Sequence, residues 1–101
     1  MPKLFEYLGI VVRIYLGDHK PIHVHAICEG NEIRVVLHEK DGIVNDIEYV
    51  PMKGVFTPAQ KRNLKAFIEE KKSAILFAWD QSQRQKGFKF KPTTITKRIK
   101  K

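Results

Sequence analysis

Two segments in which apolar and polar residues alternate, 22–29 and 32–38, constrain the fold of this chain more strongly than any other feature. Alternation with a period of two is typical of β-strands that bury one face. Gly30 and Asn31 connect the segments, and a two-residue loop with glycine first predicts a type II′ hairpin. The resulting register places apolar residues opposite one another on one face, pairing Cys28 with Ile33, Ala26 with Val35 and Val24 with Leu37.

The other face of the predicted hairpin carries three of the four histidines of the chain. In the same register His23 lies opposite His38, and His25 projects from the same side as both. Glu29 lies opposite Glu32, a like-charged pair that is unfavourable unless both side chains reach water. The sequence therefore predicts a three-histidine surface on the face away from the core.

Further strands are predicted on both sides of this hairpin. The β-branched and aromatic segment 10–16 predicts a strand before it. A strand is also predicted over 43–49, with Ile43, Ile47 and Tyr49 on its apolar side.

A single helix is predicted from Pro58 to about Gln83. Thr57 is a suitable N-cap, and proline is favoured at the first helical position. The residues that follow helical spacing and face the sheet are Leu64, Ile68, Ile75 and Trp79. The predicted fold class is α+β: a small antiparallel β-meander of three to four strands packed on one C-terminal α-helix.

Segment 74–79 is apolar on every side of this helix. A helix that is apolar all round is normally covered all round. Leu76 and Phe77 are therefore candidates for contact with a second copy of the chain or with a partner protein. The alternative is that loops of the same chain bury them.

Charge divides the chain of 101 residues into two parts. The net charge is +8, and the eight excess cations all follow Gln83, where no acidic residue occurs. Residues 1–83 suffice for a single domain, and 84–101 are predicted to be a mobile basic tail. The candidates for contact with RNA or DNA are Arg84, Lys86, Lys89, Lys91, Lys97, Arg98, Lys100 and Lys101. The alternatives are a solubilising arm, or an edge strand that packs Phe88 and Phe90 inward.

Several protein classes are not expected from this sequence. The longest apolar run is far shorter than the about 20 residues of a membrane span. Glu6 interrupts the apolar region that a signal peptide would need. The single cysteine, Cys28, cannot form an internal disulfide. These features predict a cytoplasmic protein without a membrane segment.

The clustered histidines suggest two kinds of chemistry. His23 and His25 stand two apart on a predicted strand, about 7 Å from each other on one side, so rotamer choice can bring both onto one metal ion. The candidate metals are zinc and iron, and the candidate ligands are His19, His23, His25 and His38.

Without a metal, His23 and His25 are candidate catalytic residues. Two imidazoles can act as general base and general acid in the transfer of an RNA 2′-hydroxyl onto phosphate. Arg13 or Arg34 would then bind the phosphate, and Tyr15 could stack on a base. The remaining alternative is that these histidines only pack and form hydrogen bonds.

Segment 18–25 reads Asp-His-Lys-Pro-Ile-His-Val-His. It resembles the hallmark of a family of small bacterial proteins known as domain of unknown function 4160, approximately Asp-His-x-Pro-Pro-His-Val-His. The similarity covers roughly residues 4–82 and includes Ala78-Trp79-Asp80, while Ile22 stands where the family usually has a second proline. The family has no established activity. The resemblance implies a small partner protein in a toxin–antitoxin-like pair, with RNA as a further candidate partner.

The sequence thus leads to three functional hypotheses. The first is a cytoplasmic binding or regulatory component of a toxin–antitoxin-like pair, with the histidine strand as its functional surface. The second is a small ribonuclease or metal-dependent hydrolase that uses His23 and His25. The third is a nucleic-acid-binding protein that acts through the basic tail.

Overall fold

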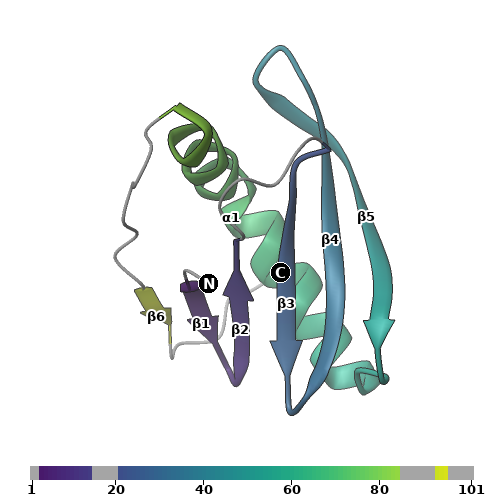
Figure 1. The fold of residues 1–101 in the computed structure, drawn as a ribbon. Helices are drawn as coiled ribbons and strands as arrows, with labels where there is room; N and C mark the ends of the chain where they lie inside the picture. The colour runs from purple at the N-terminus through teal and green to yellow at the C-terminus, as the bar shows by residue number, and fades with distance from the viewer. Residues whose placement is uncertain (1–2, 15–20, 85–92, 96–101) are drawn as a thin grey trace.

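One sheet and one long helix make up the described part of the chain (Figure 1). The structure, a computed structural model, describes residues 3–14, 21–84 and 93–95. In chain order the elements are β1 (Lys3–Tyr7), β2 (Ile10–Arg13), β3 (His23–Cys28), β4 (Asn31–Lys40), β5 (Ile43–Lys53), α1 (Pro58–Arg84) and β6 (Thr93–Ile95).

The described strands form a six-stranded sheet in the order β5-β4-β3-β2-β1-β6. Strands β1 to β5 are an antiparallel meander, and β6 pairs in parallel with β1 at the edge. The predicted α+β class, with a helix packed on a meander, is confirmed. The predicted number of three to four strands was wrong, because the short strands β1 and β6 were not foreseen. Each depends on pairing with a neighbour more than on a pattern of its own.

The turns of the meander correct the predicted register. Glu29 (φ 51°) and Gly30 (φ 81°) form the loop between β3 and β4, and positive φ at both positions defines a type I′ turn. The predicted type II′ loop of Gly30 and Asn31 was therefore wrong. Cys28 lies opposite Asn31, so the strands pair two residues away from the predicted register.

A shift of two residues leaves every side chain on its predicted face, because the side-chain period of a strand is two. Val24 now pairs with Val35, and Ala26 with Ile33. The predicted opposition of the two glutamates was wrong, since Glu29 lies in the turn and Glu32 faces Ile27. All six apolar residues assigned to the inner face are buried: Val24, Ala26, Cys28, Ile33, Val35 and Leu37.

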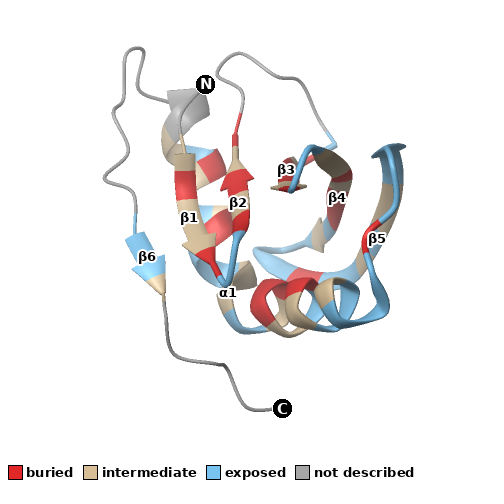
Figure 2. Cartoon of the chain, turned by 90° about the horizontal axis from the view of Figure 1, so that it is seen from below, coloured by how far each residue is buried: buried red, intermediate tan, exposed pale blue. Residues whose placement is uncertain are grey.

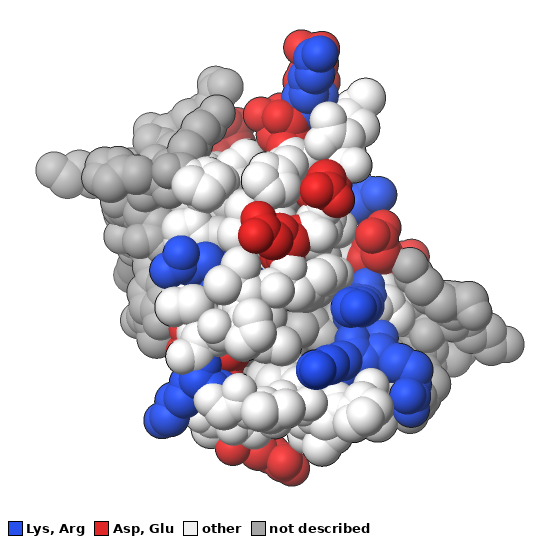
Figure 3. All heavy atoms as spheres, turned by 90° about the vertical axis from the view of Figure 1, so that its right-hand side faces the viewer, with Lys and Arg blue, Asp and Glu red and all other residues white. Residues whose placement is uncertain are grey.

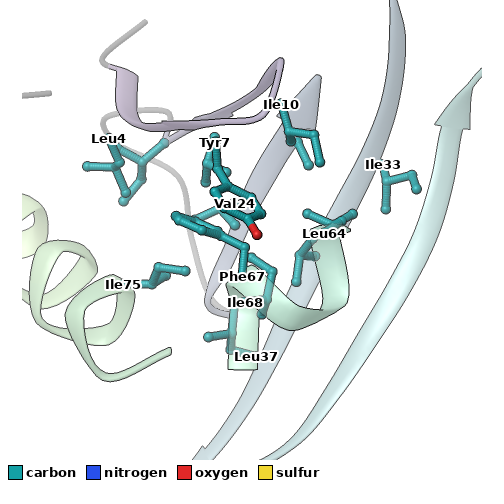
Figure 4. Close-up of a cluster of buried hydrophobic side chains, with 14 of the residues drawn as sticks. Leu4, Tyr7, Ile10, Val24, Ile33, Leu37, Leu64, Phe67, Ile68 and Ile75 are labelled. Carbon is teal, nitrogen blue, oxygen red and sulfur yellow. The ribbon is translucent and has the colours of Figure 1, made fainter. Parts of the chain in front are cut away.

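Helix α1 covers this inner face (Figure 2). The predicted helical stripe of Leu64, Ile68, Ile75 and Trp79 is buried, which confirms the prediction. Phe67 is an addition to the stripe, and its ring stacks on Tyr7 with centroids 5.0 Å apart. The core therefore lies between α1 and strands β1 to β4, as the close-up of the cluster shows (Figure 4).

The start of α1 is fixed by a capping box. Thr57 Oγ1 accepts a hydrogen bond from the Gln60 backbone N–H (3.1 Å), and Gln60 Oε1 accepts one from the Thr57 N–H (2.8 Å). The predicted cap at Thr57 and the first helical residue at Pro58 are both confirmed. Gln60 Nε2 also donates to Glu29 Oε2 at 3.2 Å, which connects the helix start to the β3–β4 turn.

Strand β5 forms one edge of the sheet and departs from its predicted pattern. The register shifts between His38 and Glu39 with Asn45 as the extra residue of β5, and such a bulge reverses the faces of Ile43 and Val44 relative to a regular strand. Val44 is therefore buried at 8 % exposure while Ile43 is 68 % exposed, so placing Ile43 on the apolar side was wrong. The strand continues through Pro51, which an edge strand tolerates. Figure 3, which faces this edge, shows acidic side chains along the upper half of the molecule.

The predicted basic tail is described only in part. Arg84 is the last residue of α1, and Thr93–Ile95 forms β6, so these three residues belong to the sheet and not to a mobile arm. Phe88 and Phe90 lie outside the described residues. Within the ranges that the structure covers, no helix is long and apolar enough to cross a membrane.

Candidate functional site

Strand β3 presents the histidine motif on the face of the sheet opposite α1, which we call the outer face. His25 lies at the centre of this face because Arg13 of β2 and Arg34 of β4 pair with it on either side. His25 is only 7 % exposed, whereas both arginines are partly exposed. The structure thus brings together the histidine and the two arginines that the sequence named as phosphate ligands.

The hydrogen bonds of His23 and His25 fix the orientation of both rings. His25 Nδ1 lies 2.9 Å from Glu32 Oε2, and His23 Nδ1 lies 2.8 Å from the Pro21 carbonyl oxygen. Carboxylate and carbonyl oxygens can only accept, so Nδ1 carries the proton in both rings. In a neutral imidazole Nε2 is then the nitrogen with the lone pair, which is the arrangement found in metal-binding and catalytic histidines.

Trp79 connects the histidine pair to the core. The rings of His23 and His25 have centroids 5.3 Å apart and are nearly perpendicular, at 75°. The centroid of the Trp79 ring lies 5.4 Å from that of His23. Since Trp79 is 3 % exposed and belongs to the core cluster, α1 directly contacts the motif of β3.

His38 does not lie opposite His23 as predicted. The corrected register places Val36 opposite His23, while His38 pairs with Asp46 and its Nε2 lies 3.3 Å from Glu48 Oε1. Among the described His, Cys, Asp and Glu residues, no three gather in a group that could hold a metal ion. His19 lies outside the described residues. A metal site that includes His19 therefore stays a prediction.

Cys28 is not part of the site. Its thiol lies on the buried inner face, and burial raises its pKa, with the charge of Glu29 adding to the effect. A raised pKa lowers the fraction of thiolate, the reactive form.

A groove of about 470 Å³ lies beside Trp79 on the α1 side of the molecule. Ile22, Leu76 and Trp79 supply its apolar surface, and Phe77 lines it while remaining 64 % exposed. Leu76, by contrast, is partly buried and packs against the core. Both predicted interface residues thus line the groove, and Phe77 is the more exposed of the two. The other residues that line the groove are Glu39, Gly42, Ser73 and Asp80.

Some residues of the predicted sites cannot be placed. Tyr15 and the tail cations from Lys86 onward lie outside the described residues, and the side chain of Arg84 is not described either. Other residues of the site were missed from the sequence. Glu32 was missed as the partner of His25 because the predicted register was displaced by two residues. The approach of Trp79 to His23 has no local signal, since 56 positions separate them.

Comparison with known proteins identifies the family. No curated protein and no solved structure is significantly similar to this chain. A family model described as "Domain of unknown function (DUF4160)" matches residues 9–80. That match includes the histidine strand, both arginines and Trp79, and it covers more than half of the sequence. The chain therefore belongs to the DUF4160 family.

Proposed function

We propose that this protein is a binding and regulatory component of a two-protein, toxin–antitoxin-like pair that acts in the cytoplasm. The observation that carries the proposal is the position of Trp79, which lines the apolar groove and also contacts the ring of His23. Trp79 is buried, and it thereby links the histidine motif to the apolar part of α1 through the core. An exposed aromatic residue beside a groove, such as Phe77, is typical of a partner-binding site.

The chemistry of the groove favours a particular kind of partner. Its apolar surface is bordered by the carboxylates of Glu39 and Asp80. A partner that inserts an apolar side chain flanked by basic residues would match both the shape and the charge. We therefore expect a small protein with a basic, partly apolar binding segment.

The test is co-expression of the full chain with the small protein proposed as its partner, followed by co-purification. Phe77→Ser should abolish the complex without unfolding the protein, because the side chain is 64 % exposed. Val55→Ser is the matched control, since Val55 is 75 % exposed and does not line the groove. A complex that survives Phe77→Ser contradicts the proposal. A homodimer that Phe77→Ser converts to a monomer would assign the groove to self-association instead.

A second candidate function is enzymatic, and the fixed rings of the histidine pair favour it. With Nδ1 of each ring bonded to an oxygen, Nε2 is the nitrogen that would exchange a proton or bind a metal. In His25 this nitrogen is buried, so a substrate would have to displace neighbouring side chains to reach it. In RNA cleavage one neutral imidazole would accept the proton of the 2′-hydroxyl. The other, protonated, would donate a proton to the departing 5′-oxygen.

RNA cleavage assays and metal analysis of untagged protein test this second function. Loss of cleavage in His23→Ala and His25→Ala, with activity retained in His38→Ala, would support acid–base catalysis. Near-stoichiometric zinc or iron that disappears in His23→Ala would support a hydrolase with a metal. Absence of both RNA cleavage and bound metal in the wild-type protein would reject the enzymatic function.

A further inference from the structure

The register of the sheet places four basic side chains in one row across the outer face. Each of four neighbouring strands contributes one of them: Lys3 on β1, Arg13 on β2, His25 on β3 and Arg34 on β4. Neighbouring strands lie about 4.8 Å apart, so the backbones of Arg13 and Arg34 are separated by roughly 10 Å across His25. Arginine side chains are long enough for both to reach one ligand between them.

Two carboxylates accept hydrogen bonds from members of this row. Glu32 accepts the hydrogen bond of His25 Nδ1, and Glu6 accepts one from Lys3 Nζ at 3.1 Å. Arg34 makes no salt bridge with any described residue, and its Nε is buried without a hydrogen-bond partner among them. No described carboxylate therefore balances the charge of this guanidinium, and a bound phosphate would supply the missing counter-charge.

We propose that Arg13 and Arg34 form a phosphate-binding site on the outer face, with His25 as its floor. Guanidinium groups bind phosphate oxygens in a bidentate geometry that a point charge cannot provide. The arginines are partly exposed while His25 is buried, so the ligand contacts the arginines first. A nucleic-acid strand is the phosphate ester that we assign to the site, because its successive phosphates can contact the arginines on the two sides of His25.

If the second candidate function is correct, this site identifies its substrate class as phosphate esters. Binding at the site does not itself require catalysis. Binding is therefore measured separately from cleavage. The probes are inorganic phosphate, a short single-stranded RNA, and an oligonucleotide of the same sequence with uncharged methylphosphonate linkages. Phosphate binding to the full chain is followed by NMR at the backbone amides of β2 and β4. RNA binding is followed by fluorescence anisotropy over a range of salt concentrations.

Arg34→Gln should weaken binding of phosphate and RNA about tenfold or more, because a charge-assisted bidentate contact is lost. Arg13→Gln should have a similar effect. In a plot of the logarithm of RNA affinity against the logarithm of salt concentration, the magnitude of the slope should fall by about 0.7 for each phosphate contact removed. Arg62→Gln, on an exposed position of α1, is the matched control and should leave affinity unchanged. Arg34→Lys keeps the charge but loses the bidentate geometry, so it should restore only part of the affinity.

Equal phosphate affinity in wild type, Arg13→Gln and Arg34→Gln would overturn the site. So would binding of the methylphosphonate oligonucleotide as tightly as RNA. Binding of inorganic phosphate without binding of RNA would support the site and would indicate that its ligand is a small phosphate compound. Binding without cleavage supports the site and counts against the enzyme. Cleavage that persists undiminished in both arginine variants supports the enzyme and overturns the site.

Discussion

The hydrogen bond between His25 and Glu32 should stabilise the fold, and Glu32→Ala measures its contribution. The bond is 2.9 Å long, and the two side chains are 8 % and 26 % exposed. Glu32→Ala would leave a buried Nδ1–H without its acceptor. A hydrogen bond to a charged group contributes about 1.5–3 kcal/mol, so Glu32→Ala should lower the free energy of unfolding by about 2 kcal/mol. For a domain of this size, that corresponds to a fall in Tm of roughly 10 °C.

Urea denaturation of matched variants separates this contribution from other effects of mutation. Glu32→Gln keeps an oxygen acceptor without the charge and should lose only about 1 kcal/mol. Glu48→Ala removes the partner of the exposed His38, a pair at 3.3 Å with side chains 47 % and 58 % exposed, and should cost less than about 0.5 kcal/mol. A loss of stability in Glu32→Ala no larger than that in Glu48→Ala would show that the buried hydrogen bond does not contribute. Equal losses in Glu32→Gln and Glu32→Ala would show that the charge of Glu32 and its acceptor oxygen have no separate effects.

Three further predictions concern a turn, a cap and a phenol. Leu8 has a φ of 48° and is 38 % exposed, so Leu8→Asn should raise the free energy of unfolding by about 0.5–1 kcal/mol in urea titrations; a loss of stability would contradict this. Thr57→Ala removes the N-cap and should cost about 1 kcal/mol by the same measurement, while Thr57→Ser should cost much less. Burial, and secondarily the charge of Glu69, raises the pKa of Tyr49 from 10.0 to about 12. Since the folded state disfavours the phenolate, stability is fully present below pH 10 and is lost as pH rises through about 12. Tyr49→Phe should reduce the loss of folding stability at high pH. If ultraviolet absorbance shows the Tyr49 phenol titrating near its ordinary pKa, the raised pKa is disproved.

The faces of the hairpin strands and the boundaries of the helix could be predicted because they depend on local sequence. Alternation decides which residues of a strand share a face, and this holds even when the register is displaced by two. Val24, Ala26 and Cys28 are therefore buried as expected, although their partners differ from those predicted. The capping residues Thr57 and Pro58 begin the helix for reasons contained in a few consecutive positions.

The partners across strands could not be predicted, because they depend on which two residues form a turn. Gly30 can serve as the first or the second residue of a two-residue loop, and the sequence alone favoured the first. The sheet instead adopts the type I′ turn, whose twist matches that of the paired strands. This choice moves His38 away from His23 and brings Glu32 to His25.

A histidine strand with a buried face, a helix that covers it and membership of the DUF4160 family all follow from local patterns in the sequence. The residues that surround the motif depend on the three-dimensional packing of the whole domain. Arg13 and Arg34 meet at His25, and Trp79 reaches His23, through contacts between residues far apart in the sequence. Such contacts follow from strand pairing and helix packing over the whole domain, which no local pattern of residues contains.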